Sequence, residues 1–243
     1  MTARLLASAP VVLRDVPLSI DPAEVRAFQS YMPPLGLPDL AARLDAARRE
    51  IEAITEPRLS YRTIPVVERE PDGLMLSDGT RLRIPGIARH WGPVDAVVVA
   101  VVTIGEAAEA LVDRRGAVDA IAGTLLDSAA SAAVECLAEW ANDYVCQLGV
   151  AANLRVTNRI SPGFAGWSLA DQATLLRLCP AAEVGVRLAP DGTMTPAKSI
   201  SLLVGIGPAA RVDHYFVQCR RCWAEGCPAR RMAPTAAVGH GRR

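Results

Sequence analysis

Two stretches near the start of the chain carry apolar residues at helical spacing. Residues 21–24 (Asp-Pro-Ala-Glu) combine an N-cap residue, a proline at the first helical position and an acid three residues after the cap. They predict a helix that runs to Tyr31. Between Asp39 and Pro57 the apolar residues fall on one helical face, which predicts a second amphipathic helix. The residues of that face are Leu40, Leu44, Ala47, Ile51 and Ile54.

The pattern then changes to short extended pieces. Between Tyr61 and Ile87, the turn signals Pro71-Asp72-Gly73 and Ser77-Asp78-Gly79 separate apolar segments, which predicts a small β-meander. Residues 95–104 form a near-continuous β-branched run, which predicts a buried strand.

Residues 106–148 are rich in helix formers, and Gly116 predicts a break between two helices. The stretch 122–141 is unusually rich in Ala, Ser and Gly, so another element or a ligand can approach it closely. The remaining expected elements are an extended segment at 154–160, a short helix from a capping-box-like start at Ser168 to Cys179, and strands at 182–188, 199–206 and 211–218.

These elements predict an α+β protein with a mostly antiparallel twisted sheet and helices packed against it. We expect three regions: a small N-terminal helical and β-meander region at 1–93, a larger α+β domain at 94–218, and a C-terminal tail at 219–243.

Composition narrows the function classes. The 243 residues include 26 basic and 26 acidic side chains, for a formal net charge of +0. Because a nucleic-acid binder usually needs a basic excess, we expect no nucleic-acid partner. The most apolar run, 96–102, is far shorter than the ~20 residues that a membrane-spanning helix needs. We therefore expect a cytoplasmic protein without a membrane partner.

Four short motifs follow one another between residues 96 and 218. They are Thr103-Ile104-Gly105, Arg159-Ile160-Ser161-Pro162-Gly163-Phe164, Val184-Gly185, and the segment from Met194 to Ser201. In this order they resemble the activation (reactivation) domain of cobalamin-dependent methionine synthase. The family usually has Tyr at the position of Phe164, so a hydrogen bond from that hydroxyl is lost here. The first ~90 residues are more similar to the front of short, stand-alone members of the family.

The second motif carries groups that suit S-adenosylmethionine. This ligand presents a carboxylate, an ammonium, a sulfonium and a flat adenine. Arg159 offers a planar fork for a carboxylate. Pro162 and Gly163 can bring backbone close to a ligand, and Phe164 and Trp167 can wall the adenine or the sulfonium. The alternatives are a surface salt bridge for Arg159 and core packing for the two aromatic residues.

Two further contacts are implied by the resemblance. Glu135, in the small-residue helix, falls near an acidic ligand contact of the family, although a solvated helix face is the alternative. Tyr215 falls where the family has a pair of aromatic residues and would contact the ribose or substrate, unless it only packs in a strand.

A C-terminal cysteine cluster, formed by Cys219, Cys222 and Cys227, has the spacing Cys-x2-Cys-x4-Cys. Three thiolates need a fourth ligand for a closed zinc site, and the candidates are His214, Cys179 and His240. The cluster predicts zinc or an iron–sulfur cluster, and the alternative is three reduced thiols.

The resemblance implies a repair reaction, in which an oxidised corrinoid receives an electron from a flavodoxin-like donor and a methyl group from S-adenosylmethionine. The chain has no Asp-x-His-x-x-Gly segment, the family's signature for holding cobalamin. A partner must therefore bring it, such as a cobalamin-binding methionine synthase subunit or another corrinoid protein.

Three alternatives stay open. The first is the same chemistry for another corrinoid-dependent methyltransferase. The second is a radical S-adenosylmethionine enzyme, although its usual Cys-x3-Cys-x2-Cys spacing and repeated βα units are absent. The third is an accessory protein, binding a metal or an iron–sulfur cluster, without catalysis of its own.

Overall fold

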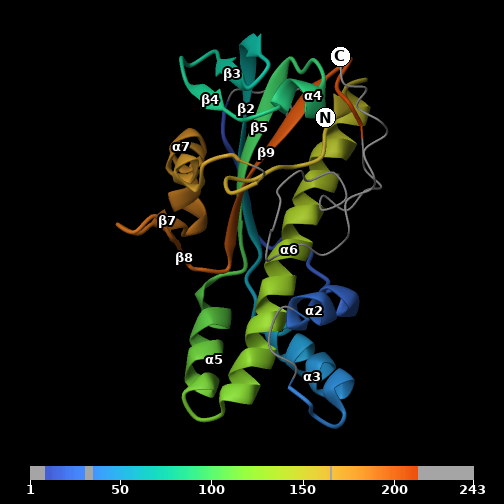
Figure 1. Ribbon diagram of the computed structural model, residues 1–243, viewed down its shortest axis with the longest axis vertical. Coiled ribbons are helices and arrows are strands. Elements are labelled where there is room, and N and C mark those ends of the chain that lie inside the picture. Colours follow the sequence, from blue (N-terminus) through green and yellow to red (C-terminus); the bar gives the residue numbers. More distant parts are fainter. Residues whose placement is uncertain (1–8, 31–34, 165, 213–243) are drawn as a thin grey trace, which may run out of the picture.

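An antiparallel sheet runs through the centre of the molecule (Figure 1). The computed structural model describes residues 9–30, 35–164 and 166–212, and in this part of the chain the sheet has seven strands. The order is β4-β3-β2-β5-β9-β6, and β1 also pairs with β2. The strands are β1 (Val11–Leu13), β2 (Arg58–Glu70), β3 (Gly73–Leu76), β4 (Arg81–Arg83), β5 (Ala96–Thr103), β6 (Arg155–Val156) and β9 (Ser199–Gly207).

The predicted β-branched strand, β5, lies in the middle of this sheet and is confirmed. All eight of its residues are buried. It pairs with β2 from Arg58↔Thr103 to Pro65↔Ala96, and with β9 on its other side. The α+β class and the antiparallel sheet are therefore as predicted. Because β2 precedes residue 93 and β5 follows it, the two predicted regions share this sheet.

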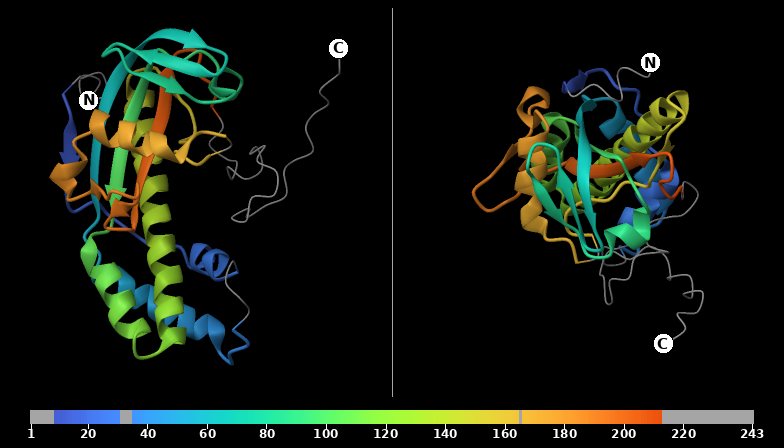
Figure 2. Two further views of the ribbon diagram at one scale, coloured as in Figure 1. Left: turned by 60° about the vertical axis from the view of Figure 1, so that its left-hand side comes forward. Right: turned by 90° about the horizontal axis from the view of Figure 1, so that it is seen from above.

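Each face of the sheet is covered by helices (Figure 2). Successive side chains of a strand point to opposite faces. Val98, Ala100 and Val102 therefore join the core under α6, while Val97 and Val99 join a second core under α4 and α7. The helices are α2 (Pro22–Gln29), α3 (Leu40–Glu52), α4 (Ile87–Trp91), α5 (Glu106–Gly116), α6 (Ala120–Ala151) and α7 (Gln172–Leu178).

The helix α6 organises one side of the protein. It crosses the sheet, and α2, α3 and α5 pack against its lower half in Figure 1. Its length and apolar composition would suit a membrane span, but 56% of its most apolar stretch is buried inside this fold, as expected for a core helix. The predicted helix break near Gly116 is confirmed, because α5 ends at Gly116 and α6 begins at Ala120. The small residues Gly116 and Gly123 let the two helices pack closely there.

The N-terminal helix start is also confirmed, since the Asp21 carboxylate accepts a hydrogen bond from the backbone N–H of Ala23 at 2.8 Å. The capping box predicted at Ser168 is wrong in detail. The Ser168 hydroxyl accepts from Ala170, whereas the Asp171 carboxylate accepts from the Trp167 indole, and a 3-10 turn (Leu169–Asp171) precedes α7.

The predicted strand at 182–188 is mostly wrong. Residues Ala181–Val184 form a 3-10 turn, and Gly185 follows with φ +84°. Only β7 (Arg187–Leu188) is extended, and it pairs with β8 (Met194–Thr195) in a separate small sheet. The strand expected at 199–206 is present as β9, and the one expected at 211–218 lies almost entirely outside the described residues.

Candidate functional site

An irregularity at the edge of the sheet positions the second sequence motif. β6 pairs with β9 at Val156↔Ile206, and the next contacts join Thr157 to Gly205. The pairing resumes three residues later at Ile160, but only two residues away on β9, at Leu203. One extra residue therefore bulges from the edge strand, as β-bulges do next to functional sites.

Arg159 lies in this bulge and points to the α6 side of the sheet. Its Nη2 donates to Glu135 Oε1 at 2.5 Å and to Glu139 Oε1 at 2.7 Å, and its Nε donates to Glu139 Oε1 at 3.1 Å. The two acids are four residues apart on α6, so they share one helix face. We call Glu135, Glu139 and Arg159 the α6 ion cluster.

The residues of the α6 ion cluster differ in burial: Arg159 is buried, whereas Glu139 is exposed. The side chain of Arg159 is 6% exposed, against 24% for Glu135 and 57% for Glu139. Burial alone would lower the pKa of the Arg159 guanidinium, but the charges and hydrogen bonds of both carboxylates outweigh it and raise that pKa above its usual value. The cluster therefore carries a net charge of −1 on a partly open face.

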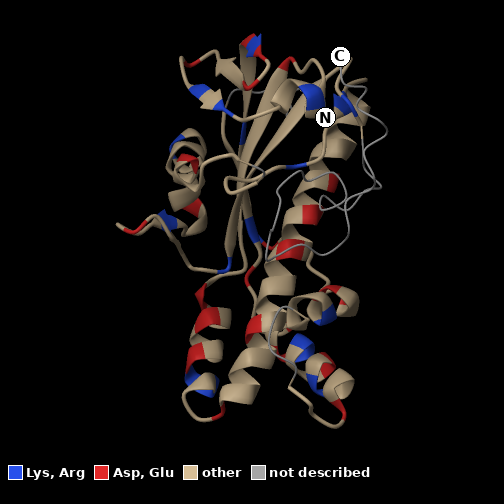
Figure 3. Ribbon diagram, in the orientation of Figure 1, with Lys and Arg blue, Asp and Glu red and all other residues tan. Residues whose placement is uncertain are grey.

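This geometry changes the expectation for Arg159. The guanidinium fork was predicted to receive a ligand carboxylate, but here two internal carboxylates occupy it, as in the salt-bridge alternative. The arrangement holds two acids in fixed positions along α6, where several acidic residues follow one another (Figure 3). A ligand contact through Arg159 itself stays a prediction.

The remainder of the second motif forms a tight loop. Phe164 N–H donates to the carbonyl of Ser161 at 2.9 Å, and Trp167 N–H donates to that of Phe164 at 2.7 Å. Gly163 has φ +90°, which favours glycine, and its N–H donates to the Trp167 carbonyl. Trp167 is 2% exposed and belongs to the core, as in the core-packing alternative. Phe164 is partly buried against the same core.

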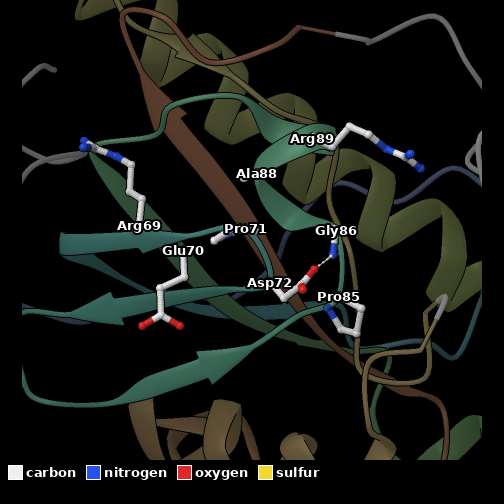
Figure 4. A pocket seen from close by; sticks show the side chains of 8 residues that line it. All are labelled: Arg69, Glu70, Pro71, Asp72, Pro85, Gly86, Ala88 and Arg89. Atoms are coloured by element: carbon white, nitrogen blue, oxygen red, sulfur yellow. Dashed lines mark hydrogen bonds between the residues drawn. The ribbon is translucent and has the colours of Figure 1, made fainter. Parts of the chain in front are cut away.

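A pocket lies elsewhere, between the β2–β3 turn and α4 (Figure 4). It has a volume of about 560 Å³. Its charged groups have partners inside the protein: Arg69 pairs with Asp95, and the Asp72 carboxylate accepts from the Gly86 N–H. None of the predicted ligand-binding residues lines it.

A pocket of about 290 Å³ draws on the other three motifs. Gly105 comes from the first motif, Val184 and Gly185 from the third, and Pro196 from the fourth. Residues far apart in the sequence thus meet at one place beside the N-terminus of α5.

Some site residues were missed and others lie outside the described part. Glu139 was missed, although its spacing of four residues from Glu135 is the helical signal that points to it. Tyr215 and the C-terminal cysteine cluster lie outside the described residues. Within residues 9–30, 35–164 and 166–212, no group of three His, Cys, Asp or Glu residues could hold a metal ion.

Cys179, a candidate fourth metal ligand, lies in a structural environment. Its thiol is 2% exposed and within hydrogen-bond distance of the Ser60 hydroxyl and carbonyl. Burial raises the pKa of the Cys179 thiol to about 11, so it stays protonated at neutral pH.

Comparison with known proteins defines the class of fold. No family model matches the chain, and no curated protein matches it. Among solved structures, the fold is that of a reactivation domain. The chain is similar to the crystal structure of the MetH reactivation domain bound to AdoHcy, with a TM-score of 0.56 and 15% identity, over 86% of this chain and 81% of that chain. The resemblance indicated by the four sequence motifs is therefore confirmed at the level of the fold.

Proposed function

We propose that this protein binds S-adenosylmethionine and supports the reductive remethylation of a corrinoid held by a partner protein. The observation that carries the proposal is the shared fold with a reactivation domain that was solved with AdoHcy (S-adenosylhomocysteine) bound. The four sequence motifs support it independently of the fold.

The chemistry of the α6 ion cluster fits the methyl donor. S-adenosylmethionine carries an ammonium, a sulfonium and a carboxylate, and so has one net positive charge. The cluster carries one net negative charge on a face where Glu139 is 57% exposed. The two are complementary, and a partly desolvated site strengthens that attraction relative to water.

The proposed roles follow from position. Arg159 holds Glu135 and Glu139 in place. Gly163 keeps the loop after Arg159 compact, and backbone groups of Pro162 and Gly163 and the ring of Phe164 are proposed as further ligand contacts on the strength of the resemblance. Tyr215 is proposed as a further contact on the strength of the resemblance alone.

The proposed methyl transfer requires no acid–base catalysis from this protein. The corrinoid cobalt supplies the nucleophile that accepts the methyl group, so no general base is required. The protein contributes binding and orientation of the sulfonium methyl group, which is catalysis by proximity. Because the corrinoid must leave again to meet its other substrates, we propose a transient, modest and partly polar contact with the partner.

The proposed partner is a cobalamin-binding subunit of a methionine synthase, with a corrinoid protein of another methyltransferase as the second candidate. A flavodoxin-like protein is proposed as the electron donor. These assignments rest on the resemblance of the motifs and on the lack of an Asp-x-His-x-x-Gly segment in the sequence.

A reconstitution experiment tests the reaction. The protein is mixed with a partner loaded with cob(II)alamin, a reductant and S-adenosylmethionine labelled in its methyl group, and the visible spectrum is followed. Methylcobalamin should appear, with the label, only when all components are present, and more slowly with Glu135→Gln. Equal rates with and without this protein would refute the proposal and favour a binding or assembly role.

A further inference from the structure

Three acceptor atoms on one face of α6 receive no hydrogen bond from the described residues. The three hydrogen bonds that Arg159 donates to Glu135 and Glu139 go to their Oε1 atoms, which leaves Oε2 of Glu135 and Oε2 of Glu139 without a donor among the described residues. The third atom is Oδ1 of Asn142, which is buried and has no partner.

Asn142 belongs to the same face as the α6 ion cluster. It follows Glu139 by three residues and Glu135 by seven, which places the three side chains in one row along the helix. Asn142 is 4% exposed, and its Nδ2 makes only a long contact of 3.7 Å with the Cys146 sulfur. Whichever way the amide is turned, one of its polar ends lacks a strong partner. A buried polar group of this kind calls for an explanation, because proteins usually satisfy such groups.

A second buried polar group lies in the segment that carries Arg159. The hydroxyl of Ser161 also has no partner among the described residues. Ser161 follows Arg159 by two residues, directly after Ile160, which pairs with Leu203 at the edge of the sheet. Buried polar groups without a partner among the described residues therefore occur both on α6, at Asn142, and in the segment that carries Arg159, at Ser161.

The net charge of the α6 ion cluster and its three acceptor atoms define the kind of ligand group that would suit this face. The cluster has a net charge of −1 and a surplus of oxygen acceptors, so an anion would be repelled. A primary ammonium carries one positive charge and three N–H donors, which matches the three acceptors of this face. Glu139 is the most exposed of the three residues, and Asn142 is the most buried.

We infer that Asn142 is a further ligand-contact residue, which together with Glu135 and Glu139 receives the primary ammonium of the amino-acid end of an S-adenosyl ligand. This inference rests on the proposed function and deepens it, because it orients the ligand along α6 with its amino-acid end toward the C-terminal half of the helix.

Two ligands distinguish a contact with the amino-acid end from contacts with the nucleoside. S-adenosylhomocysteine and 5′-methylthioadenosine share the nucleoside and a neutral sulfur, but only the first has the amino-acid end. Their affinities are measured by calorimetry for the unsubstituted protein, Asn142→Leu and Asn142→Asp. Leu has a similar volume and removes the unsatisfied group, so this variant should unfold at the same temperature or higher, and Asp keeps the acceptor oxygens. Gln147→Leu, on the exposed side of α6, is the matched control.

Asn142→Leu should weaken binding of S-adenosylhomocysteine about tenfold and leave that of 5′-methylthioadenosine unchanged, whereas Asn142→Asp and Gln147→Leu should retain both. Unchanged affinity for S-adenosylhomocysteine in Asn142→Leu, or an equal loss for both ligands, would overturn the assignment of Asn142 while leaving the proposed function intact. If the unsubstituted protein binds neither S-adenosylhomocysteine nor S-adenosylmethionine, the proposed function itself fails, and this assignment with it.

Discussion

Removing the charge of Arg159 tests the physical basis of the site. In Arg159→Met the side chain keeps its length and flexibility, so the packed position stays filled, but Glu135 and Glu139 lose their shared counter-charge. Breaking a fully buried ion pair costs about 3–5 kcal/mol. The two carboxylates here are 24% and 57% exposed, so water can solvate them after the change and the cost is smaller.

We expect Arg159→Met to lower the free energy of unfolding by about 2 kcal/mol, below the full cost of breaking a buried pair. In a domain of this size that change corresponds to a fall of about 4–8 °C in the melting temperature. Urea unfolding followed by circular dichroism at neutral pH measures it. Arg114→Met, on the exposed face of α5, is the control and should change stability by less than ~0.5 kcal/mol.

A second substitution locates the effect. Glu139→Gln in the Arg159→Met background removes one of the two uncompensated carboxylates, so it should recover part of the lost stability, whereas the same change in the unsubstituted protein should reduce stability. If Arg159→Met is as stable as the control, the α6 ion cluster does not hold the edge strand to α6, and the structural role given to Arg159 is refuted.

Three further predictions concern other parts of the chain. Burial raises the pKa of the Cys179 thiol from 9.0 to about 11, so the unfolded chain ionises first as the pH rises. Stability should therefore fall between about pH 9 and pH 11, by up to ~1.4 kcal/mol per pH unit, and Cys179→Ala should reduce this slope in pH-dependent unfolding. A Cβ at Gly123 would lie 2.5 Å from the Gly116 Cα, so Gly123→Ala should destabilise by about 1–3 kcal/mol in a thermal melt, whereas Gly79→Ala, in an exposed turn where a Cβ meets nothing within 4 Å, should cost less despite its strained φ. The C-terminal cysteine cluster should retain about one zinc ion, or iron with sulfide, by elemental analysis and lose it when all three residues are changed to Ser; metal-free protein prepared without chelator would favour three reduced thiols.

The elements that the sequence predicts well are those with strong local patterns. The eight buried β-branched and small residues of β5 and the helix break at Gly116 were both legible in the sequence. The full length of β2 could not be predicted. The turn signals around it are local, whereas its 13-residue extent is set by pairing with β5 and β3. The strand predicted at 182–188 was wrong because apolar residues alone do not distinguish a strand from other buried segments. Here they reach the core from a 3-10 turn and a short hairpin.

The candidate site shows the same limit. The motif around Arg159 could be found in the sequence, but the partners of the guanidinium lie 20 and 24 residues away on α6. Which acids meet Arg159 depends on how α6 crosses the edge of the sheet, and no local pattern encodes that crossing. Glu139 and Asn142 became candidates only when the helix face that carries Glu135 was placed beside the bulge.

Binding of S-adenosylmethionine by the protein alone is the most direct test of the proposed function. Calorimetric titration, supported by the ligand-dependent melting temperature, measures this without any partner. We predict saturable binding of one ligand per chain, stabilisation that grows with ligand concentration, and weaker binding in Glu135→Gln. No heat and no thermal shift at millimolar S-adenosylmethionine, from protein shown to be folded, would contradict the central claim.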